Sequence, residues 1–189
     1  KICHYLDLPI QHASDDVLKR MGRRTSKEEL IHIISRIREE IPDITLRTTL
    51  ITGFPGESKE QHEELMDFVD EMAFDRLGVF TYSAEDGTPA AQMPDQVEES
   101  VKEARRAELM ELQQEIAFDQ AEQMIGREVL VMIEGKVADE NAYVGRTYKD
   151  APNVDGLIFV NTDTELLSGD FAKVRVTGAC EYDLIGELM

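Results

Sequence analysis

The sequence predicts an α/β unit built on parallel strands, followed by one long helix and a small antiparallel β-barrel of the OB type. Three observations carry this prediction. Strand and helix patterns alternate over residues 1–82, a stretch without Gly or Pro runs from Gln96 to Met124, and five short apolar segments occupy the remainder. Alternating strands and helices are typical of a parallel sheet, whereas short, evenly spaced strands are typical of a barrel.

Three segments of the first part have the composition of strands. Residues 2–8 form a short apolar run that ends at Pro9, which is typical of a buried strand. Residues 45–52 are rich in β-branched side chains, and residues 76–82 form a third such segment. We expect these three segments to form the parallel sheet.

Two capping boxes mark the starts of helices between these strands. Ser26 stands three residues before Glu29, and Ser58 stands three residues before Gln61. Apolar residues at helical spacing follow each box and define the faces expected to be buried: Leu30, Ile33, Ile34, Ile37 and Ile41 in the first helix, and Leu65, Phe68, Val69 and Met72 in the second. His32 and His62 fall on these helices and are expected at the surface.

The long helix from Gln96 to Met124 has a composition of high intrinsic helix propensity, and Gly126 ends it. The five strands predicted after it are residues 128–133, 142–147, 157–160, 172–177 and 182–188. We therefore divide the chain into residues 1–123, which include the linking helix, and residues 124–189, which form the barrel.

The composition restricts the partners. The chain has 39 acidic and 20 basic residues and a net charge of −19, which disfavours binding to phosphate backbones. Residues 124–189 alone contain 12 acidic and 6 basic residues. No apolar run is long enough to span a membrane. The start at Lys1 indicates the middle of a longer protein, and Cys3 and Cys180 are expected to be free thiols, although their spacing leaves one disulfide open.

Polar or glycine-rich segments follow all three predicted strands. Gln11 and His12 follow the first strand, the turn Gly53–Glu57 follows the second, and residues 80–83 end the third. Taken singly, each is more often a structural element than a ligand site. Because the carboxyl ends of parallel strands meet at one sheet edge, their convergence favours a ligand site there.

Several segments together resemble the methylthiotransferase branch of the radical S-adenosylmethionine (SAM) enzymes. The residues that carry the resemblance are 5–12, 19–24, 46–57 and 80–83, and residues 124–189 resemble a TRAM domain. The resemblance implies that residues 1–123 form the C-terminal half of a partial radical SAM barrel. It covers essentially the whole chain in the expected order.

Within that branch, the chain resembles the RimO-like subfamily, which modifies an aspartate in the twelfth protein of the small ribosomal subunit. The distinguishing segments are His12 after Leu-Pro-Ile-Gln, Glu85-Asp86-Gly87, residues 145–156 and residues 181–184. The acidic balance agrees, because a ribosomal protein is basic whereas tRNA is a polyanion. The alternatives are a MiaB-like enzyme acting on a tRNA adenosine and a non-enzymatic acidic binding module.

The resemblance implies SAM and two [4Fe–4S] clusters in the full-length enzyme. The family's CxxxCxxC loop is absent, so this chain has no cluster ligands, contains no catalytic residue that we assign, and is expected to be inactive alone. The residues implied on the SAM and substrate side are Gln11, His12, Thr49, Ile51, Gly53, Phe54, Pro55, Gly56, Glu57 and Tyr82.

The implied partner is the basic ribosomal protein, bound through the acidic TRAM domain, with neither tRNA nor a membrane as a partner and with a cytoplasmic location. A half-barrel would leave helix faces that carry Ile33, Ile34, Leu65 and Phe68 uncovered. We therefore expect the isolated chain to self-associate through residues 1–90.

Overall fold

A computed structural model describes residues 2–189. The chain divides into two compact units. One unit is Leu6–Ile116, and the other combines Ala117–Met189 with the N-terminal residues up to Tyr5.

The first unit is organised around a three-stranded sheet in the order β1-β2-β3. Its strands are β1 (Tyr5–Asp7), β2 (Thr45–Thr52) and β3 (Arg76–Thr81). β2 and β3 are parallel, with Arg47 opposite Arg76 and Thr52 opposite Thr81, and Gln11 pairs in parallel with Leu50 beyond the end of β1. The second and third predicted strands are confirmed, and so is the parallel arrangement.

The first strand differs from its prediction. Only Tyr5–Asp7 is a strand, and its residues are partly or largely exposed rather than buried. The reason is its place at the edge of the sheet, where it has a neighbour on one side only.

Four α-helices connect or follow these strands, together with a short 3₁₀-helix, η1 (Ala90–Gln92). They are α1 (Asp15–Arg20), α2 (Lys27–Glu40), α3 (Lys59–Met72) and α4 (Glu99–Glu122). Both predicted capping boxes are formed, with Ser26 and Ser58 as the N-caps. α1 and η1 were not predicted. Ile33 is exposed, contrary to the prediction, because the buried face of α2 is centred on Leu30 and Ile34.

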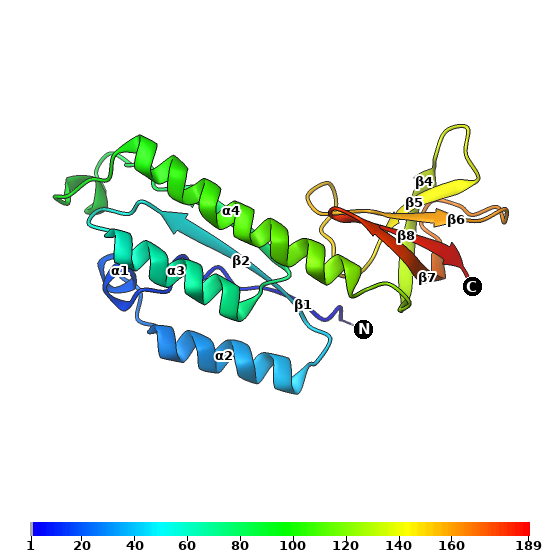
Figure 1. Cartoon of the computed structure of the whole chain (residues 1–189), viewed down its shortest axis with the longest axis horizontal. Coiled ribbons are helices and arrows are strands. Elements are labelled where there is room, and N and C mark those ends of the chain that lie inside the picture. Colours follow the sequence, from blue (N-terminus) through cyan, green and yellow to red (C-terminus); the bar gives the residue numbers. More distant parts are fainter. Residues whose placement is uncertain (1) are drawn as a thin grey trace. The chain divides into compact units, whose positions relative to one another are not determined.

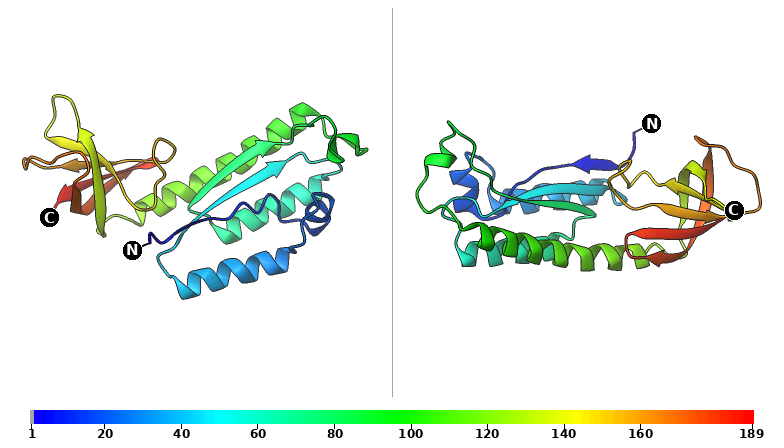
Figure 2. Two further views of the ribbon diagram at one scale, coloured as in Figure 1. Left: turned by 180° about the vertical axis from the view of Figure 1, so that it is seen from behind. Right: turned by 90° about the horizontal axis from the view of Figure 1, so that it is seen from above.

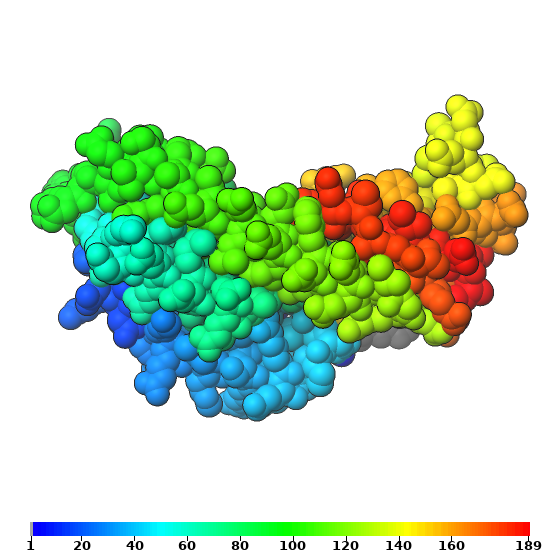
Figure 3. Space-filling view, in the orientation of Figure 1, coloured from blue at the N-terminus to red at the C-terminus, as the bar shows by residue number. Residues whose placement is uncertain are grey.

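The helices cover one face of the sheet. In Figure 1, α3 and α4 lie in front of the strands, and the view from behind in Figure 2 shows the strands in front of these helices. In Figure 3, α2, α3 and the first part of α4 form one continuous surface on this side. Every second residue of β2 is fully buried, namely Leu46, Thr48, Leu50 and Thr52, and the leucines join the side chains of α2, α3 and α4 in one core.

The other face of the sheet is open. Arg47, Thr49 and Ile51 of β2 are partly exposed, and Phe80 of β3, opposite Ile51, is 62% exposed. We expected uncovered apolar surface on the helices, but the structure has it on the sheet. Ile34, Leu65 and Phe68 are fully buried, because β2 covers the helix faces that carry them.

The second unit contains a closed five-stranded barrel in the order β4-β5-β6-β8-β7. Its strands are β4 (Glu128–Lys136), β5 (Ala142–Arg146), β6 (Ile158–Asn161), β7 (Phe171–Cys180) and β8 (Asp183–Leu188). All five predicted strands are present. Alternate residues such as Val131, Ile133, Val160 and Val174 fill the interior.

The barrel is mixed rather than antiparallel, which corrects the prediction. β6 and β8 pair in parallel, with Phe159 opposite Ile185, whereas the other four pairs are antiparallel. The reason is geometric, because a closed ring with an odd number of strands cannot alternate direction at every contact. One parallel pair is therefore required, and the order of the strands places it between β6 and β8.

Candidate functional site

A cavity of about 620 Å³ opens at the carboxyl ends of β2 and β3. Strand ends, the turn after β2, the segment after α1 and the loop around η1 all contribute to it. The lining residues are Gln11, Arg20, Met21, Gly22, Arg23, Ile51, Phe54, Phe80, Thr81, Tyr82, Ser83, Thr88, Pro89, Ala90 and Met93. The wall is thus mainly apolar and aromatic, with two arginines. Such a cavity suits a ligand that combines a flat apolar part with polar or charged groups.

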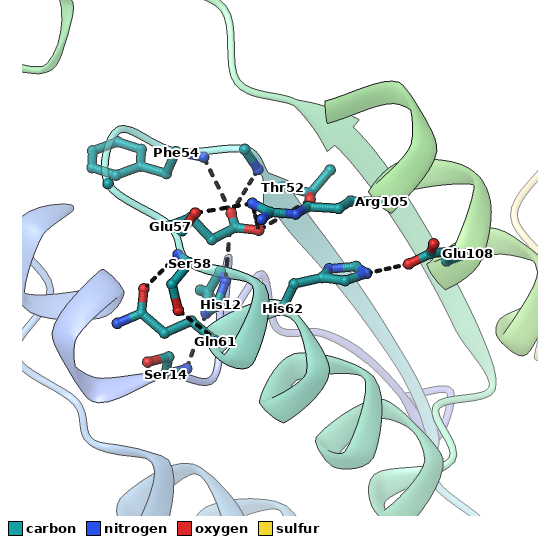
Figure 4. A network of polar contacts seen from close by, with 12 residues as sticks. His12, Ser14, Thr52, Phe54, Glu57, Ser58, Gln61, His62, Arg105 and Glu108 are labelled. Carbon is teal, nitrogen blue, oxygen red and sulfur yellow. Dashed lines mark hydrogen bonds and ion pairs between the residues drawn. The ribbon is translucent and has the colours of Figure 1, made fainter. Parts of the chain in front are cut away.

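The turn Gly53–Glu57 shapes one side of this cavity and is organised around a buried carboxylate. Glu57 accepts hydrogen bonds from the backbone N–H of Gly53 at 2.6 Å and of Phe54 at 3.2 Å. Gly53 has a φ of +72°, a left-handed conformation that glycine adopts without strain. Figure 4 shows the carboxylate inside the turn, with these donors around it. Glu57 therefore fixes the path of the chain between β2 and α3.

Three further side chains reach the same carboxylate, and one of them is Thr52, whose Oγ1 donates to Glu57 Oε1 at 3.4 Å. Arg105 of α4 places Nη1 3.0 Å from Glu57 Oε1 and 3.1 Å from its backbone oxygen. His12 places Nε2 3.7 Å from Glu57 Oε2, which is too long for a direct hydrogen bond. Because His12 Nδ1 accepts the N–H of Ser14 at 2.9 Å, a neutral His12 carries its proton on Nε2, facing Glu57.

Burial acts to raise the pKa of Glu57. His12, Arg105 and the N–H of Gly53 act in the opposite direction and prevail, so the pKa of Glu57 lies below its ordinary value. Glu57 is consequently an anion at neutral pH, enclosed by donors and cut off from solvent.

Gln11 is held in an unusual backbone conformation beside the cavity. Its φ is +72°, which costs a non-glycine residue free energy. Its N–H donates to Thr49 O at 2.9 Å, and its carbonyl accepts the N–H of Ile51 at 2.8 Å. These two bonds tie the residue to β2 while its side chain lines the cavity. Strain of this kind is a common feature of ligand-binding positions.

Phe54 and Tyr82 form an aromatic part of the cavity wall. Their ring centroids are 5.1 Å apart in an edge-to-face arrangement. The hydroxyl of Tyr82 is buried and has no hydrogen-bond partner among residues 2–189.

The structure separates the ten predicted site residues into two groups. Four line the cavity, namely Gln11, Ile51, Phe54 and Tyr82. Six do not: Gly53, Pro55, Gly56 and Glu57 form the turn, Thr49 lies on the open sheet face, and His12 is fully buried. His12 and Glu57 hold the turn from inside.

Sequence reasoning did not assign several lining residues. Arg20, Met21 and Arg23 belong to segment 19–24, which carried the family resemblance but was not assigned a role. Pro89, Ala90 and Met93 come from the loop around η1, whose sequence has no signal that places it beside β2.

His62 corrects the expectation of a surface position. Its side chain is buried between α3 and α4, and Nε2 lies 2.7 Å from Glu108 Oε2. Figure 4 shows this pair next to the network of Glu57. The acidic partner comes from α4, far away in the sequence, which is why the pattern of α3 alone placed His62 at the surface.

No three His, Cys, Asp or Glu side chains of residues 2–189 lie together as metal ligands would. Cys3 and Cys180 are exposed and free. Within the same residues, no helix combines the length and apolar character that crossing a bilayer requires.

Two protein families match the chain. Residues 1–69 match the radical SAM superfamily, and residues 125–189 match the TRAM domain. Each unit is matched in part, and residues 70–124 lie between the two matches.

Individual relatives extend the match to nearly the whole chain. A ribosomal protein uS12 methylthiotransferase RimO from Lachnoclostridium phytofermentans is 65% identical over 186 residues, which are 98% of this chain and 42% of that protein. Proteins of the same name from Desulfitobacterium hafniense and Pelotomaculum thermopropionicum are 49% and 51% identical. The chain spans about 42% of the length of these relatives.

Among solved structures, coproporphyrinogen III oxidase from Escherichia coli, described as a radical SAM enzyme, is similar to part of the chain. It is 21% identical with a TM-score of 0.45, over 66% of this chain and 28% of that one. The sequence relatives and the two domain matches carry the assignment. The chain belongs to the RimO-type radical SAM methylthiotransferases, in which it corresponds to the C-terminal part of the radical SAM domain together with the TRAM domain.

Proposed function

We propose that this chain is the C-terminal part of an enzyme that methylthiolates an aspartate of ribosomal protein uS12 by radical SAM chemistry. The observation that carries the proposal is the 65% identity, over 98% of the chain, to a protein named for that activity. We propose residues 1–123 as the part that belongs to the radical SAM domain, with its linking helix, and residues 124–189 as the TRAM domain.

The cavity at the ends of β2 and β3 is the proposed place for the adenosyl part of SAM. Ile51, Phe54 and Tyr82 offer an apolar and aromatic wall for the flat adenine. Gln11 adds a polar group at the wall. Glu57 acts from behind the wall, because its carboxylate accepts the N–H of Phe54 and so keeps this residue in place.

The iron–sulfur clusters do not fit the residues of this chain. Cluster iron is held by several cysteine thiolates, whereas the chain has two cysteines, both outside the cavity lining. When bound elsewhere in the enzyme, a cluster supplies the electron that starts SAM cleavage. The chain alone is therefore proposed to be inactive and to bind SAM weakly.

The open face of the sheet supports a longer protein. Parallel sheets are normally covered on both faces, and here the face with Ile51 and Phe80 is uncovered. We propose that strands outside this chain complete the barrel over it. The isolated chain is expected to cover the same face by self-association, and light scattering at tens of micromolar protein tests this.

The acidic barrel is proposed to receive the basic ribosomal protein. Residues 124–189 contain twice as many acidic as basic residues, namely 12 and 6. This balance favours a cationic protein over tRNA.

A direct test joins this chain to the N-terminal part of the Lachnoclostridium phytofermentans relative, in place of that protein's own C-terminal part. After cluster reconstitution, we expect the hybrid to add one methylthio group to uS12, seen by mass spectrometry. Modification of tRNA instead, with tRNA binding that falls steeply as salt rises, would support a MiaB-like enzyme. A hybrid that folds, cleaves SAM and modifies neither substrate would refute the proposal.

A further inference from the structure

Lys102 of α4 contacts the ends of both strands that form the cavity wall. Its side chain is mostly buried, and the residue is 8% exposed. Nζ donates to the carbonyl of Tyr82 at 2.9 Å and to Glu99 Oε2 at 3.1 Å, and lies 5.5 Å from the centroid of the Tyr82 ring. A Cβ added at Gly53 would lie 2.2 Å from Lys102 Cγ, so the stem of Lys102 packs directly on Gly53.

The two strands need such a bridge because their pairing stops at the cavity. The last ladder position joins Thr52 to Thr81, and the N–H of Tyr82 still donates to Thr52 O at 2.9 Å. Beyond this point the chain after β2 turns into α3, whereas the chain after β3 enters the loop around η1. Phe54 and Tyr82, the two rings of the wall, stand just where the backbones separate.

We propose that Lys102 is a positioning residue that sets the spacing of Phe54 and Tyr82 and so shapes the wall for the adenosyl group. This inference rests on the proposed function of the cavity. Lys102 touches Gly53, the neighbour of Phe54, through its stem and Tyr82 through its ammonium. One side chain thereby fixes both rings relative to each other.

Anchoring of α4 alone does not account for this lysine. Leu109 of α4 is fully buried in the core, Arg105 bonds Glu57, and Gln113 bonds Phe74 O at 2.9 Å. α4 is thus attached without Lys102. A buried cation is a costly way to stabilise a fold, and a hydrophobic side chain of similar volume often serves as well or better. What the ammonium adds here is a directed bond to the Tyr82 carbonyl.

The geometric consequence is testable on the whole chain by NMR. Lys102→Met keeps an apolar stem over Gly53 but removes the ammonium, and Lys102→Arg keeps a cation. Arg106→Met is the matched control, because Arg106 lies on the same helix, is solvent-exposed and pairs with Glu103 at 2.9 Å. We expect Lys102→Met to lose the ring-to-ring NOEs between Phe54 and Tyr82, while Lys102→Arg and Arg106→Met retain them. Unchanged NOEs in Lys102→Met would overturn the proposal.

The functional consequence is measured on the reconstituted hybrid with S-adenosylhomocysteine as the probe, by calorimetry. We expect Lys102→Met to weaken binding about tenfold, the order of one lost charged hydrogen bond, and Lys102→Arg to restore most of it. Phe54→Ala reports on the cavity itself. If Phe54→Ala leaves affinity unchanged, the proposed site fails; if Phe54→Ala weakens binding and Lys102→Met matches Arg106→Met, the positioning role fails.

A folding defect does not obscure this result. Should Lys102→Met fail to fold, Lys102→Arg still decides, because it keeps the cation. A folded Lys102→Arg variant that binds at least tenfold more weakly than the parent protein and has lost the Phe54–Tyr82 NOEs would show that a cation at this position does not set the spacing.

Discussion

Replacing Glu57 by Gln should destabilise the unit Leu6–Ile116 far more than an ordinary loss of one negative charge. The carboxylate is buried and accepts from Gly53 N–H, Phe54 N–H and Arg105 Nη1, all within 3.2 Å. The Glu57→Gln side chain keeps one oxygen, which can still accept some of these hydrogen bonds. The other carboxylate oxygen is replaced by an NH₂ group, which cannot accept a hydrogen bond from the donors that face it.

The magnitude follows from what is left unpaired. A hydrogen bond to a charged group is worth about 1.5–3 kcal/mol, and removing one partner of a buried ion pair costs about 3–5 kcal/mol. Arg105 is mostly buried and would lose its anion, although it keeps the Glu57 backbone oxygen at 3.1 Å. We therefore expect Glu57→Gln to lower the free energy of unfolding of this unit by about 3–4 kcal/mol.

Urea unfolding followed by the helical far-UV circular dichroism signal measures this change. The signal reports on the unit Leu6–Ile116, which contains α1, α2, α3 and most of α4, whereas the barrel consists of strands. Glu63→Gln is the control, because Glu63 is 58% exposed, its partner Lys59 is 80% exposed, and such pairs contribute about 0–1 kcal/mol. A Glu57→Gln effect within about 1 kcal/mol of the control would show that Glu57 does not organise the turn.

Three further results are expected. The unit Leu6–Ile116 should lose stability as the pH falls below about 4.5, because the pKa of Glu57 is lowered in the folded state and protonation removes the stabilisation that its carboxylate provides. Glu57→Gln should flatten the dependence of the free energy of unfolding on pH in this range. Gln11→Gly should leave the free energy of unfolding unchanged or raise it by up to about 1 kcal/mol, because it relieves the strain of a φ of +72°, and clear destabilisation would contradict that strain. The same variant should weaken the binding of S-adenosylhomocysteine by the hybrid. Gly186→Ala should destabilise the barrel alone, because its Cβ would lie 2.4 Å from Val174 Cγ1 and 2.8 Å from Arg175 O. Amides of the barrel should then lose protection from hydrogen exchange, and intact protection would argue against this packing.

Local sequence patterns were sufficient for most of the secondary structure. The Ser58–Gln61 capping box predicted the start of α3, and β-branched residues predicted β2 at its observed bounds, Thr45–Thr52. These signals succeed because caps and strand composition act between residues close together in the chain. The same locality explains why the turn Gly53–Glu57 could be placed at the end of a strand from sequence alone.

The sequence also identified the sheet edge that carries the cavity, but not the role of each residue there. Gln11 and His12 are adjacent and polar, yet Gln11 lines the cavity and His12 is fully buried. The backbone decides between them, because the left-handed conformation of Gln11 directs successive side chains to different environments. No pattern of residue types carries that information.

Contacts between distant segments were decided only by the tertiary structure. Lys102, Arg105 and Glu108 read as ordinary charged residues of a long helix, but each meets a partner 20 to 48 residues away: Tyr82, Glu57 and His62. In the barrel, likewise, the parallel pairing of β6 with β8 follows from closing five strands into a ring. Sequence periodicity reports which side of an element is buried; which element covers that side depends on how the whole chain packs, and this determines whether a buried charge finds its counter-charge.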